Sequence, residues 1–341
     1  MDDGAVAARV PETRAPLDVL IVGAGPAGLA VAIAAREAGL RHEVVEKGVL
    51  VNSIYHFPRN MIFFTTAELL EIGGLPFVTP YEKPTQAEGL KYYRRVADAY
   101  ELPIAMDEDV TAIRRDGAGD AAGFVVESRR RGEGRRRRAH NVVVATGYYD
   151  HPNLLDVPGE DLPHVSHYYR EAHAYHRRNV VVVGGRNSAA IVALELYRAG
   201  ATVTLVHRGA RLGASVKYWI RPDIENRIQE GSIAARFETR VVEITPDHVV
   251  VEDGGGRHRL PADAVFLLTG YHPDCALLEA AGVRVDPATL VPEHDRETLE
   301  TNVRGLYLAG AIVSGRETGR IFIENGRFHG RAIVDSIRSR R

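Results

Sequence analysis

A glycine-rich turn near the start of the chain limits the fold more than any other feature of the sequence. The turn, GAGPAG over 23–28, follows an apolar run typical of a buried strand, 18–22, and precedes small helix-forming residues over 29–37. A second apolar run ends at Glu46. A strand, a G-x-G-x-x-G turn, a helix and a second strand that ends in an acid together predict a Rossmann-like dinucleotide-binding unit.

Each position of this turn has a physical role. Gly23 permits the tight turn, Gly25 lets the backbone approach a pyrophosphate, and Gly28 lets the helix pack closely on the strand. The amino end of the helix offers unpaired N–H groups to phosphate, and a carboxylate after the second strand accepts hydrogen bonds from a ribose diol. The predicted nucleotide-binding residues of this unit are Gly23, Gly25, Pro26, Ala27, Gly28, Glu46 and Lys47.

The same order of elements returns later in the chain. A strand over 179–183 leads into GGRNSA, a helix follows over 189–198, and a further strand runs over 202–206. The sequence therefore predicts a second dinucleotide-binding unit. Its predicted binding residues are Gly184, Gly185, Arg186, Asn187, Ser188, Ala189, His207 and Arg208.

Two departures distinguish the second unit from the first. Arg186 stands where the first turn has its second glycine, and a side chain there should crowd or re-route the pyrophosphate. His207 and Arg208 follow the second strand, where the first unit has Glu46. A cation at this place suits the 2′-phosphate of NADPH better than the 2′-hydroxyl of NADH. The alternative is that Arg208 is an ordinary solvated side chain at a strand end.

Three further strand-like runs define the domain organisation. They are NVVVATG at 141–147, AVFLLTG at 264–270 and GLYLAG at 305–310. They indicate that the first domain is interrupted by the second and then resumes. We expect an α/β protein of two Rossmann-like dinucleotide-binding domains, one inserted into the other, with boundaries at 1–158, 159–272 and 273–341.

Composition excludes several kinds of chemistry. The single cysteine, Cys275, excludes an intrachain disulfide, a Cys-x-x-Cys redox pair and a thiolate-rich metal site. A cluster of histidines (His164, His167, His173 and His176) lacks the spacing of a zinc site, so we expect no metal.

Charge and hydropathy bear on partners and location. The chain has 43 Lys and Arg against 45 Asp and Glu, so its Arg-rich run over 129–138 indicates a solvated hairpin tip, and we expect no nucleic acid partner. The longest uncharged run, 19–35, is too short and too rich in glycine for a membrane span. Residues 1–18 lack the pattern of a secretory signal, so we expect no membrane partner and a cytoplasmic location.

Four long stretches strongly resemble one known family, the YpdA-type bacillithiol disulfide reductases within the thioredoxin reductase-like flavoproteins. These stretches are VNSIYHFPRNMIFFTTAELLEIGGLPF (51–77), KPTQAEGLKYYRRVADAYEL (83–102), HYYREAHAYHRRNVVVVGGRNSAA (167–190) and IFIENGRFHG (321–330). The resemblance implies FAD in the first domain, NADPH in the second, and reduction of a low-molecular-weight disulfide.

The chain departs from the family pattern at two positions. Firmicute members carry a cysteine before the final glycine of the first turn, where this chain has Ala27. Thioredoxin reductases place an aspartate that contacts the flavin ribityl chain after Leu-Ala-Gly, where this chain has Ala311. The thiol chemistry of the family therefore cannot be transferred, and the ribityl contact must be absent or supplied otherwise.

Site residues are also expected outside the two turns. The resemblance places Asn52, Ser53 and Tyr55 beside the flavin. We expect the adenine near Val110, and we expect 321–325 to open the last helix toward the flavin ring, with an ordinary packed helix as the alternative. The alternative for Tyr55, as for Phe57, Phe63 and Phe64, is a place in the core. Further expected FAD contacts are Thr65, Thr146, Gly147, Gly310 and Ile321, and further NADPH contacts are Lys217 and Gly270.

The sequence does not identify a catalytic residue, since it contains no redox cysteine pair. Tyr55 is a candidate because it is expected beside the flavin. The expected function is an NADPH-dependent FAD oxidoreductase with a small-molecule disulfide or a redox protein as acceptor, forming a homo-oligomer. The alternatives are a thioredoxin reductase-like ferredoxin or flavodoxin–NADP reductase and a non-catalytic redox-sensing module. A flavin monooxygenase is disfavoured, because Asp161 and Pro163 interrupt its expected F-x-G-x-x-x-H pattern.

Overall fold

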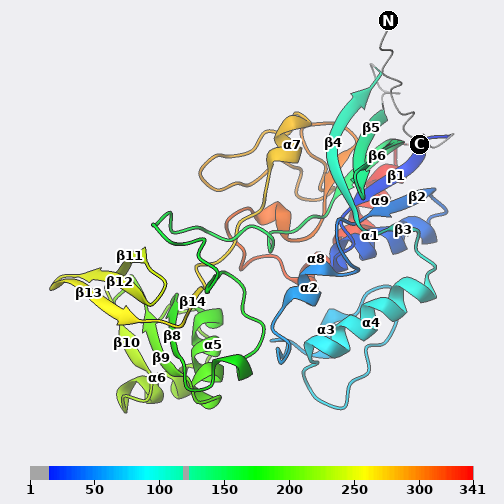
Figure 1. The fold of residues 1–341 in the computed structure, drawn as a ribbon. Coiled ribbons are helices and arrows are strands. Elements are labelled where there is room, and N and C mark those ends of the chain that lie inside the picture. The colour runs from blue at the N-terminus through cyan, green and yellow to red at the C-terminus, as the bar shows by residue number, and fades with distance from the viewer. Residues whose placement is uncertain (1–14, 118–122, 341) are drawn as a thin grey trace, which may run out of the picture. The chain divides into compact units, whose positions relative to one another are not determined.

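The computed structural model describes residues 15–117 and 123–340. The described chain forms two compact units (Figure 1). The first unit contains the described residues up to Tyr55, Ile62–His151 and Tyr271 onward, and the second contains His56–Met61 and Pro152–Gly270. One unit is therefore inserted into the other, as the order of the strand-like runs predicts.

The first unit is built on a seven-stranded sheet in the order β3-β2-β1-β6-β5-β4, with β15 also paired to β6. Its strands are β1 (Leu17–Val22), β2 (His42–Val45), β3 (Ile104–Ala105), β4 (Glu108–Asp116), β5 (Gly123–Arg130), β6 (Glu133–Val144) and β15 (Leu306–Leu308). The long strand β6 changes partners along its length. Its first part pairs antiparallel with β5, and its last residues pair parallel with β1 and β15.

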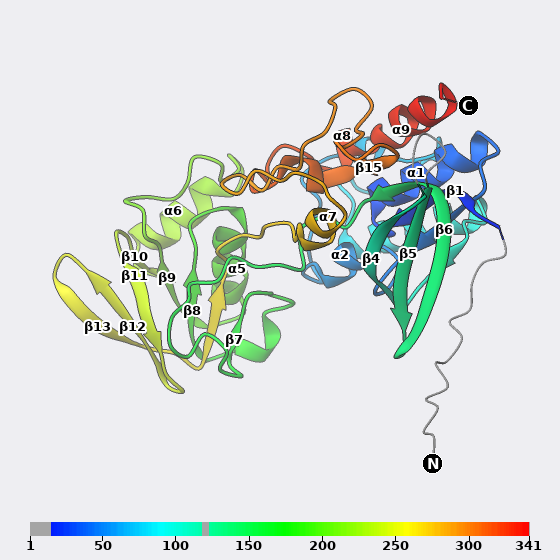
Figure 2. The same cartoon turned by 90° about the horizontal axis from the view of Figure 1, so that it is seen from above.

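The first unit also contains helices. They are α1 (Pro26–Glu37), α2 (Asn52–His56, whose last residue belongs to the second unit), α3 (Ala67–Leu70), α4 (Gln86–Ala99), α7 (Ala276–Ala280), η2 (Gly310–Ser314), α8 (Ile323–Gly326) and α9 (His329–Arg338). Of these, α1 and α7 contact the sheet. Helices α1 and α9 lie side by side (Figure 2). Gly330 makes this approach possible, because a Cβ there would lie 2.4 Å from the carbonyl oxygen of Ala30.

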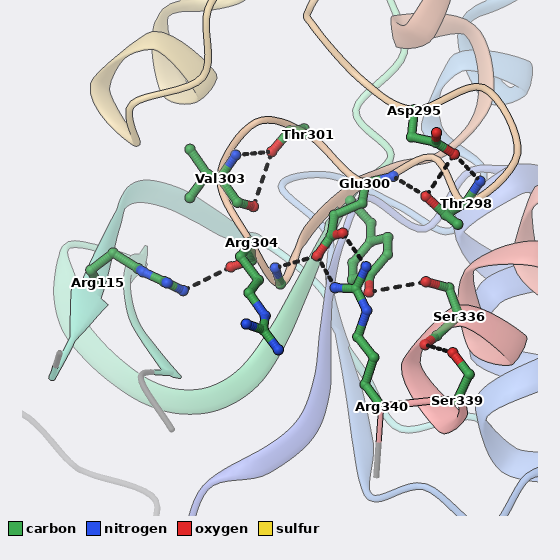
Figure 3. A network of polar contacts seen from close by, with 12 residues as sticks. Arg115, Asp295, Thr298, Glu300, Thr301, Val303, Arg304, Ser336, Ser339 and Arg340 are labelled. Carbon is green, nitrogen blue, oxygen red and sulfur yellow. Dashed lines mark hydrogen bonds and ion pairs between the residues drawn. The ribbon is translucent and has the colours of Figure 1, made fainter. Parts of the chain in front are cut away.

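Hydrogen bonds join the C-terminal helix and the residues after it to β15 and the loop that precedes it (Figure 3). The Arg340 guanidinium donates through both terminal nitrogens to the Glu300 carboxylate. One oxygen of that carboxylate also accepts the Gly305 N–H at 2.8 Å, and Tyr307 Oη lies 3.4 Å from Ser336 Oγ. Because these contacts join α9 to both ends of the loop, they hold the helix against the sheet that carries the first turn.

The Arg-rich run forms a hairpin, as predicted, but it is not wholly solvated. Strands β5 and β6 meet at Arg131 and Gly132, which both have positive φ. Arg137 is only 6% exposed and donates to Glu43 at 2.8 Å and to the fully buried Glu108. The alternation of a strand turns Arg137 inward, and paired carboxylates make its burial tolerable.

The second unit has a five-stranded parallel sheet in the order β10-β9-β8-β14-β7 and a three-stranded antiparallel sheet, β11-β12-β13. Its strands are β7 (Val165–Ser166), β8 (Asn179–Val183), β9 (Thr202–Val206), β10 (Ala234–Arg236), β11 (Arg240–Ile244), β12 (His248–Asp253), β13 (Gly256–Pro261) and β14 (Ala264–Leu267), and its helices are η1 (His173–Tyr175), α5 (Asn187–Arg198) and α6 (Arg221–Gln229). Alternate residues of β8 face opposite layers. Val180 and Val182 pack with α5, whereas Val181 and Val183 pack with the antiparallel sheet.

The two crossings between the units differ from the predicted boundaries after 158 and 272. The first lies between His151 and Pro152, and the second between Gly270 and Tyr271. The first prediction is late because Pro158 already belongs to the second unit, where its carbonyl oxygen accepts the N–H of Ile244 at 2.9 Å. Residues 56–61, predicted as part of the first domain, also belong to the second unit.

Candidate functional site

The first turn has the geometry that a dinucleotide pyrophosphate requires. Gly23 has φ +105° and a Cβ there would lie 2.6 Å from the Ala145 carbonyl oxygen, while a Cβ on Gly28 would lie 2.0 Å from the Gly23 carbonyl oxygen. Gly25, by contrast, has no atom within 4 Å of its would-be Cβ. The turn is therefore tight on its protein side and open at Gly25, where a phosphate would approach the first N–H groups of α1.

Glu46 is held in place beside the first turn. Its side chain is 5% exposed, and its two carboxylate oxygens accept the N–H groups of Ala24 at 2.7 Å and Gly48 at 2.9 Å. Burial raises the pKa of Glu46. Since each carboxylate oxygen can accept more than one hydrogen bond, Glu46 keeps capacity for a ribose diol while it fixes the turn.

Lys47, predicted as a cofactor contact, forms an ion pair with Asp150 at 2.8 Å. Asp150 lies just beyond Thr146 and Gly147, the predicted contacts after β6, so the pair joins the chain after β2 to the chain after β6. Thr146 is exposed and Gly147 has φ +70°. No feature of the sequence singles out Asp150.

The segment after Glu46 folds back over the turn. Val51, at φ +48°, donates its N–H to the Ala24 carbonyl oxygen at 3.1 Å. Asn52 begins α2, and its Oδ1 lies 2.4 Å from the would-be Cβ of Gly48. Ser53 is half-buried, and Tyr55 is 45% exposed. Tyr55 is therefore not a core residue, contrary to the alternative interpretation, whereas Phe63 is buried.

Thr65 and Val110 both follow this region in the sequence. Val110 is half-buried at an irregularity in the pairing of β4 with β5. Strand β4 begins beside the acid of the first unit, because the Glu108 N–H donates to the Glu46 carbonyl oxygen at 2.9 Å. That contact places the start of β4, which contains Val110, next to Glu46. Thr65 is half-buried just before α3.

Gly310 and Ile321 come together with the first turn. Gly310 starts η2 at φ +75°, and its would-be Cβ lies 2.7 Å from Cβ of Ala27. A Cβ on Gly326 would lie 3.3 Å from Cγ2 of Ile321 and 3.5 Å from Cα of Gly310. The resemblance therefore selects residues that do meet around the amino end of α1.

The prediction that 321–325 opens the last helix is wrong. These residues lead into α8, a single turn of four residues, and the last helix, α9, begins at His329. Between them Arg327 and Phe328 keep a right-handed helical backbone, but the N–H of Phe328 donates to the carbonyl oxygen of Asn325, three residues back, so the α-helical pattern is interrupted there. The Arg327 guanidinium donates to the carbonyl oxygens of Glu68 at 2.7 Å and Glu71 at 2.9 Å. A single turn sums few peptide dipoles, so the predicted stabilisation of the flavin by the dipole of a long helix is not available at 321–325.

The second turn repeats the tight glycine and differs at the next position. Gly184 has φ +149°, and its would-be Cβ lies 2.6 Å from the Leu268 carbonyl oxygen. Gly185 lies flat against the ring of His207, since a Cβ there would be 2.3 Å from that ring. The contact between Gly185 and His207 gives this glycine a packing role that the sequence pattern did not indicate.

The predicted cations gather at the carboxyl ends of β8 and β9. Burial, followed by the charges of Arg208 and Arg186, lowers the pKa of His207. The ring of His207 is therefore neutral at pH 7, and the positive charge of this place comes from the two arginines, whose side chains are exposed. This charge suits a phosphate group.

The side chain of Asn187 joins the second turn to the backbone of Ser215 and Lys217. Asn187 donates from Nδ2 to the Ser215 carbonyl oxygen at 3.0 Å and accepts the Lys217 N–H at 2.9 Å. The Lys217 ammonium lies 5.8 Å from the centre of the Trp219 ring. Ser188 is exposed and Ala189 is buried in α5. Gly270 does not join this cluster but pairs with the first crossing, where it accepts the Asn153 N–H at 2.9 Å.

Cys275 is placed for packing rather than reaction. Its side chain is 6% exposed at the start of α7, and its Sγ lies 3.7 Å from the Leu290 carbonyl oxygen. Burial raises the pKa of its thiol to about 11, with smaller contributions from the nearby Glu279 and Asp274. Since the thiolate is the nucleophile, this thiol is unreactive at neutral pH.

The described residues also bear on a metal ion and a membrane as partners. Within 15–117 and 123–340, no group of three or more His, Cys, Asp or Glu side chains is arranged to hold a metal ion. No helix of that part of the chain is long and apolar enough to cross a membrane.

Comparison with known proteins identifies the class and then the family. The model of the pyridine nucleotide-disulphide oxidoreductases matches residues 20–310, so the chain belongs to that class, whose fold of two dinucleotide-binding units is described above. The chain is 42% identical to the bacilliredoxin reductase Bdr of Bacillus subtilis over 94% of its length and 97% of the relative's. It therefore belongs to the YpdA-type family, as the four stretches in the sequence predict.

Solved structures agree with this assignment. Bacillithiol disulfide reductase Bdr (YpdA) from Bacillus cereus superposes with a TM-score of 0.92 at 41% identity, covering 96% of this chain and 100% of the other. The Staphylococcus aureus protein of the same name gives 0.89 at 36%, covering 95% and 98%. The chain is thus an FAD-dependent oxidoreductase that uses NADPH, as predicted.

Proposed function

We propose that this protein reduces a low-molecular-weight disulfide, such as bacillithiol disulfide, with electrons from NADPH. The observation that carries the proposal is the similarity to bacillithiol disulfide reductases, which extends over 96% of the chain with a TM-score of 0.92. In the net reaction NADPH and one proton reduce the disulfide to two thiols and leave NADP⁺. When bound, FAD supplies the redox chemistry, and the protein supplies binding and orientation.

The proposal assigns FAD to the first unit and NADPH to the second. Gly23–Gly28 would hold the FAD pyrophosphate and Glu46 its ribose, because the turn is open at Gly25 and the carboxylate is fixed beside it. Arg208 and Arg186 would hold the 2′-phosphate of NADPH, because their charges gather where the first unit has an acid. The remaining predicted contacts belong to the same proposal, except Gly270, which lies at the crossing beside Asn153.

The acceptor site would contain no protein thiol. Ala27 occupies the position of the family cysteine, and Cys275 is buried with a raised pKa. The disulfide would therefore bind directly over the flavin, on the side of the exposed Tyr55. Tyr55 would bind and orient the acceptor and would not itself be oxidised or reduced.

The deciding experiment compares acceptors side by side. NADPH consumption is followed with bacillithiol disulfide, an oxidised bacilliredoxin, oxidised thioredoxin, oxidised ferredoxin and oxygen, with an equal amount of enzyme in each assay. The proposal expects the highest kcat/KM with bacillithiol disulfide. A higher kcat/KM with any of the protein acceptors would overturn it.

A ferredoxin–NADP reductase is the second candidate. The relative of that name from Ignicoccus hospitalis is 25% identical over 86% of the chain, and such a reaction needs no dithiol in the reductase. Preferred turnover with ferredoxin in the same assays would favour it. A module that senses redox state without turnover would reduce none of the acceptors.

The proposal also includes two expectations, about the location and the oligomeric state of the protein. A cytoplasmic location follows from the chemistry, since NADPH-driven reduction of disulfides maintains the reducing state of the cytosol. A homo-oligomer is expected as well, and light scattering of the purified protein measures its mass directly.

A further inference from the structure

Gly310 lies in a confined place beside the first turn. It adopts φ +75° at the start of η2, a conformation that favours glycine. Its would-be Cβ is 2.7 Å from Cβ of Ala27 on one side, and its Cα is 3.5 Å from the would-be Cβ of Gly326 on another. Movement of this backbone would therefore displace the amino end of α1 or the turn α8.

The N–H of Gly310 is bound by a histidine. It donates to Nδ1 of His329, the first residue of α9, at 3.0 Å. Because Nδ1 accepts, the proton of the neutral ring is on Nε2. Burial lowers the pKa of His329, and the nearby His294 lowers it further, so Nδ1 stays an acceptor at neutral pH.

The helix that carries His329 has little freedom to shift. Gly330, the next residue, packs against the backbone of Ala30 in α1, where a Cβ would lie 2.4 Å from the carbonyl oxygen. The far end of α9 is fastened by the contact between Arg340 and Glu300 (Figure 3). His329 is thus a fixed acceptor, and it determines where the N–H of Gly310 points.

We propose that His329 is a positioning residue of the FAD site, whose Nδ1 holds Gly310 against Ala27 and so fixes the wall of the site beside the amino end of α1. Because Gly310 has no side chain, it leaves room for the cofactor. Its N–H donates to His329 and not to the cofactor. Ala311 offers no polar side chain at the next position, so the wall is held from the protein side. This inference rests on the proposed place of FAD at Gly23–Gly28.

Three substitutions at His329 separate its acceptor from its bulk. In Asn, the acceptor Oδ1 is bonded to Cγ, as Nδ1 is in His. In Gln, the acceptor lies one bond further from the backbone. Leu is similar in size to His and has no acceptor. The dissociation constant of FAD is measured by diluting each purified holoprotein and following the fluorescence of released flavin. We expect about 10-fold weaker FAD binding for His329→Leu and His329→Gln, and a change within about threefold for His329→Asn. His140→Leu, at an exposed position of β6, is the control and should match the parent.

Two results would overturn the inference. One is equal FAD binding in all variants, and the other is an equal loss in all three, Asn included, which would show a role in size alone. If His329→Leu does not fold, the comparison of Asn with Gln decides in the same way. Full FAD content in Gly25→Val would instead overturn the proposed place of the cofactor, so the two failures are distinguishable.

Discussion

The two nucleotide turns of this protein share their first glycine and diverge after it. Gly23 and Gly184 both have positive φ, and a Cβ on either would lie 2.6 Å from the carbonyl oxygen of a neighbouring chain segment, at Ala145 and Leu268 respectively. The later positions differ. Gly28 allows no Cβ at all, whereas Ala189 carries one at the equivalent place.

The greatest difference lies after the second strand of each unit. In the first, Glu46 binds the N–H of Ala24, and in the second the neutral ring of His207 packs on Gly185. On the proposed binding sites, the backbone of the fold would determine where a nucleotide binds, and the side chains after the second strand would determine which nucleotide it is. Four substitutions test this comparison.

The largest effect on stability is expected from a methyl group at Gly28, where α1 approaches the first turn most closely. Gly28→Ala would place Cβ 2.0 Å from the Gly23 carbonyl oxygen, so α1 must move away from β1. We expect the free energy of unfolding, measured by urea denaturation, to fall by about 3 kcal/mol with loss of FAD. The matched change in the second turn, Ala189→Gly, should cost at most about 1 kcal/mol. Full stability of Gly28→Ala would show that the two turns are equally permissive.

Gly25→Val tests the open side of the first turn. No atom lies within 4 Å of the would-be Cβ, so the fold should tolerate valine, with a change in unfolding free energy within about 1 kcal/mol. The side chain would occupy the place of the pyrophosphate, and the purified protein should be colourless. Gly254→Val, where a Cβ also meets nothing, should keep one FAD per chain as the control. A yellow Gly25→Val protein would contradict the placement of FAD.

Arg208→Ala tests the charge difference between the units. Loss of a charge-assisted contact to the 2′-phosphate should weaken NADPH binding about 10- to 150-fold and leave NADH nearly unchanged. Titration of each nucleotide into the oxidised protein measures both constants. Arg240→Ala, an exposed arginine on β11, is the control and should change neither. An equal loss for NADPH and NADH would show that Arg208 has a structural role only.

The smallest effect is expected at the only cysteine of the chain. Neither turn carries a thiol, since Ala27 and Ser188 occupy equivalent positions, and the Cys275 thiol has a pKa of about 11. We expect Cys275→Ser to keep NADPH-dependent disulfide reduction within about threefold of the parent at pH 7. A loss of about a hundredfold, with FAD content and its reduction by NADPH intact, would make Cys275 the nucleophile and refute the hypothesis of a thiol-free site.

The sequence by itself determined the elements that local rules govern. The strands over 18–22, 179–183 and 202–206 and the helices after both turns lie where hydrophobic runs and glycine spacing predict them. These signals are local, because strand alternation, helix periodicity and the need for glycine at a tight turn act within a few residues. The insertion of one unit into the other followed from the order of the strand-like runs, and the family followed from four long stretches.

Only the tertiary structure decided which distant residues meet. The ion pair of Lys47 with Asp150, the burial of Arg137 between Glu43 and Glu108, and the bond from Gly310 to His329 join segments that no periodicity relates. The same holds for the hydrogen bonds from Arg327 to the carbonyl oxygens of Glu68 and Glu71, which join the segment between α8 and α9 to α3 and the residue after it. A polar side chain takes the partner that packing brings within reach, and that choice depends on the whole fold and not on the neighbours in sequence.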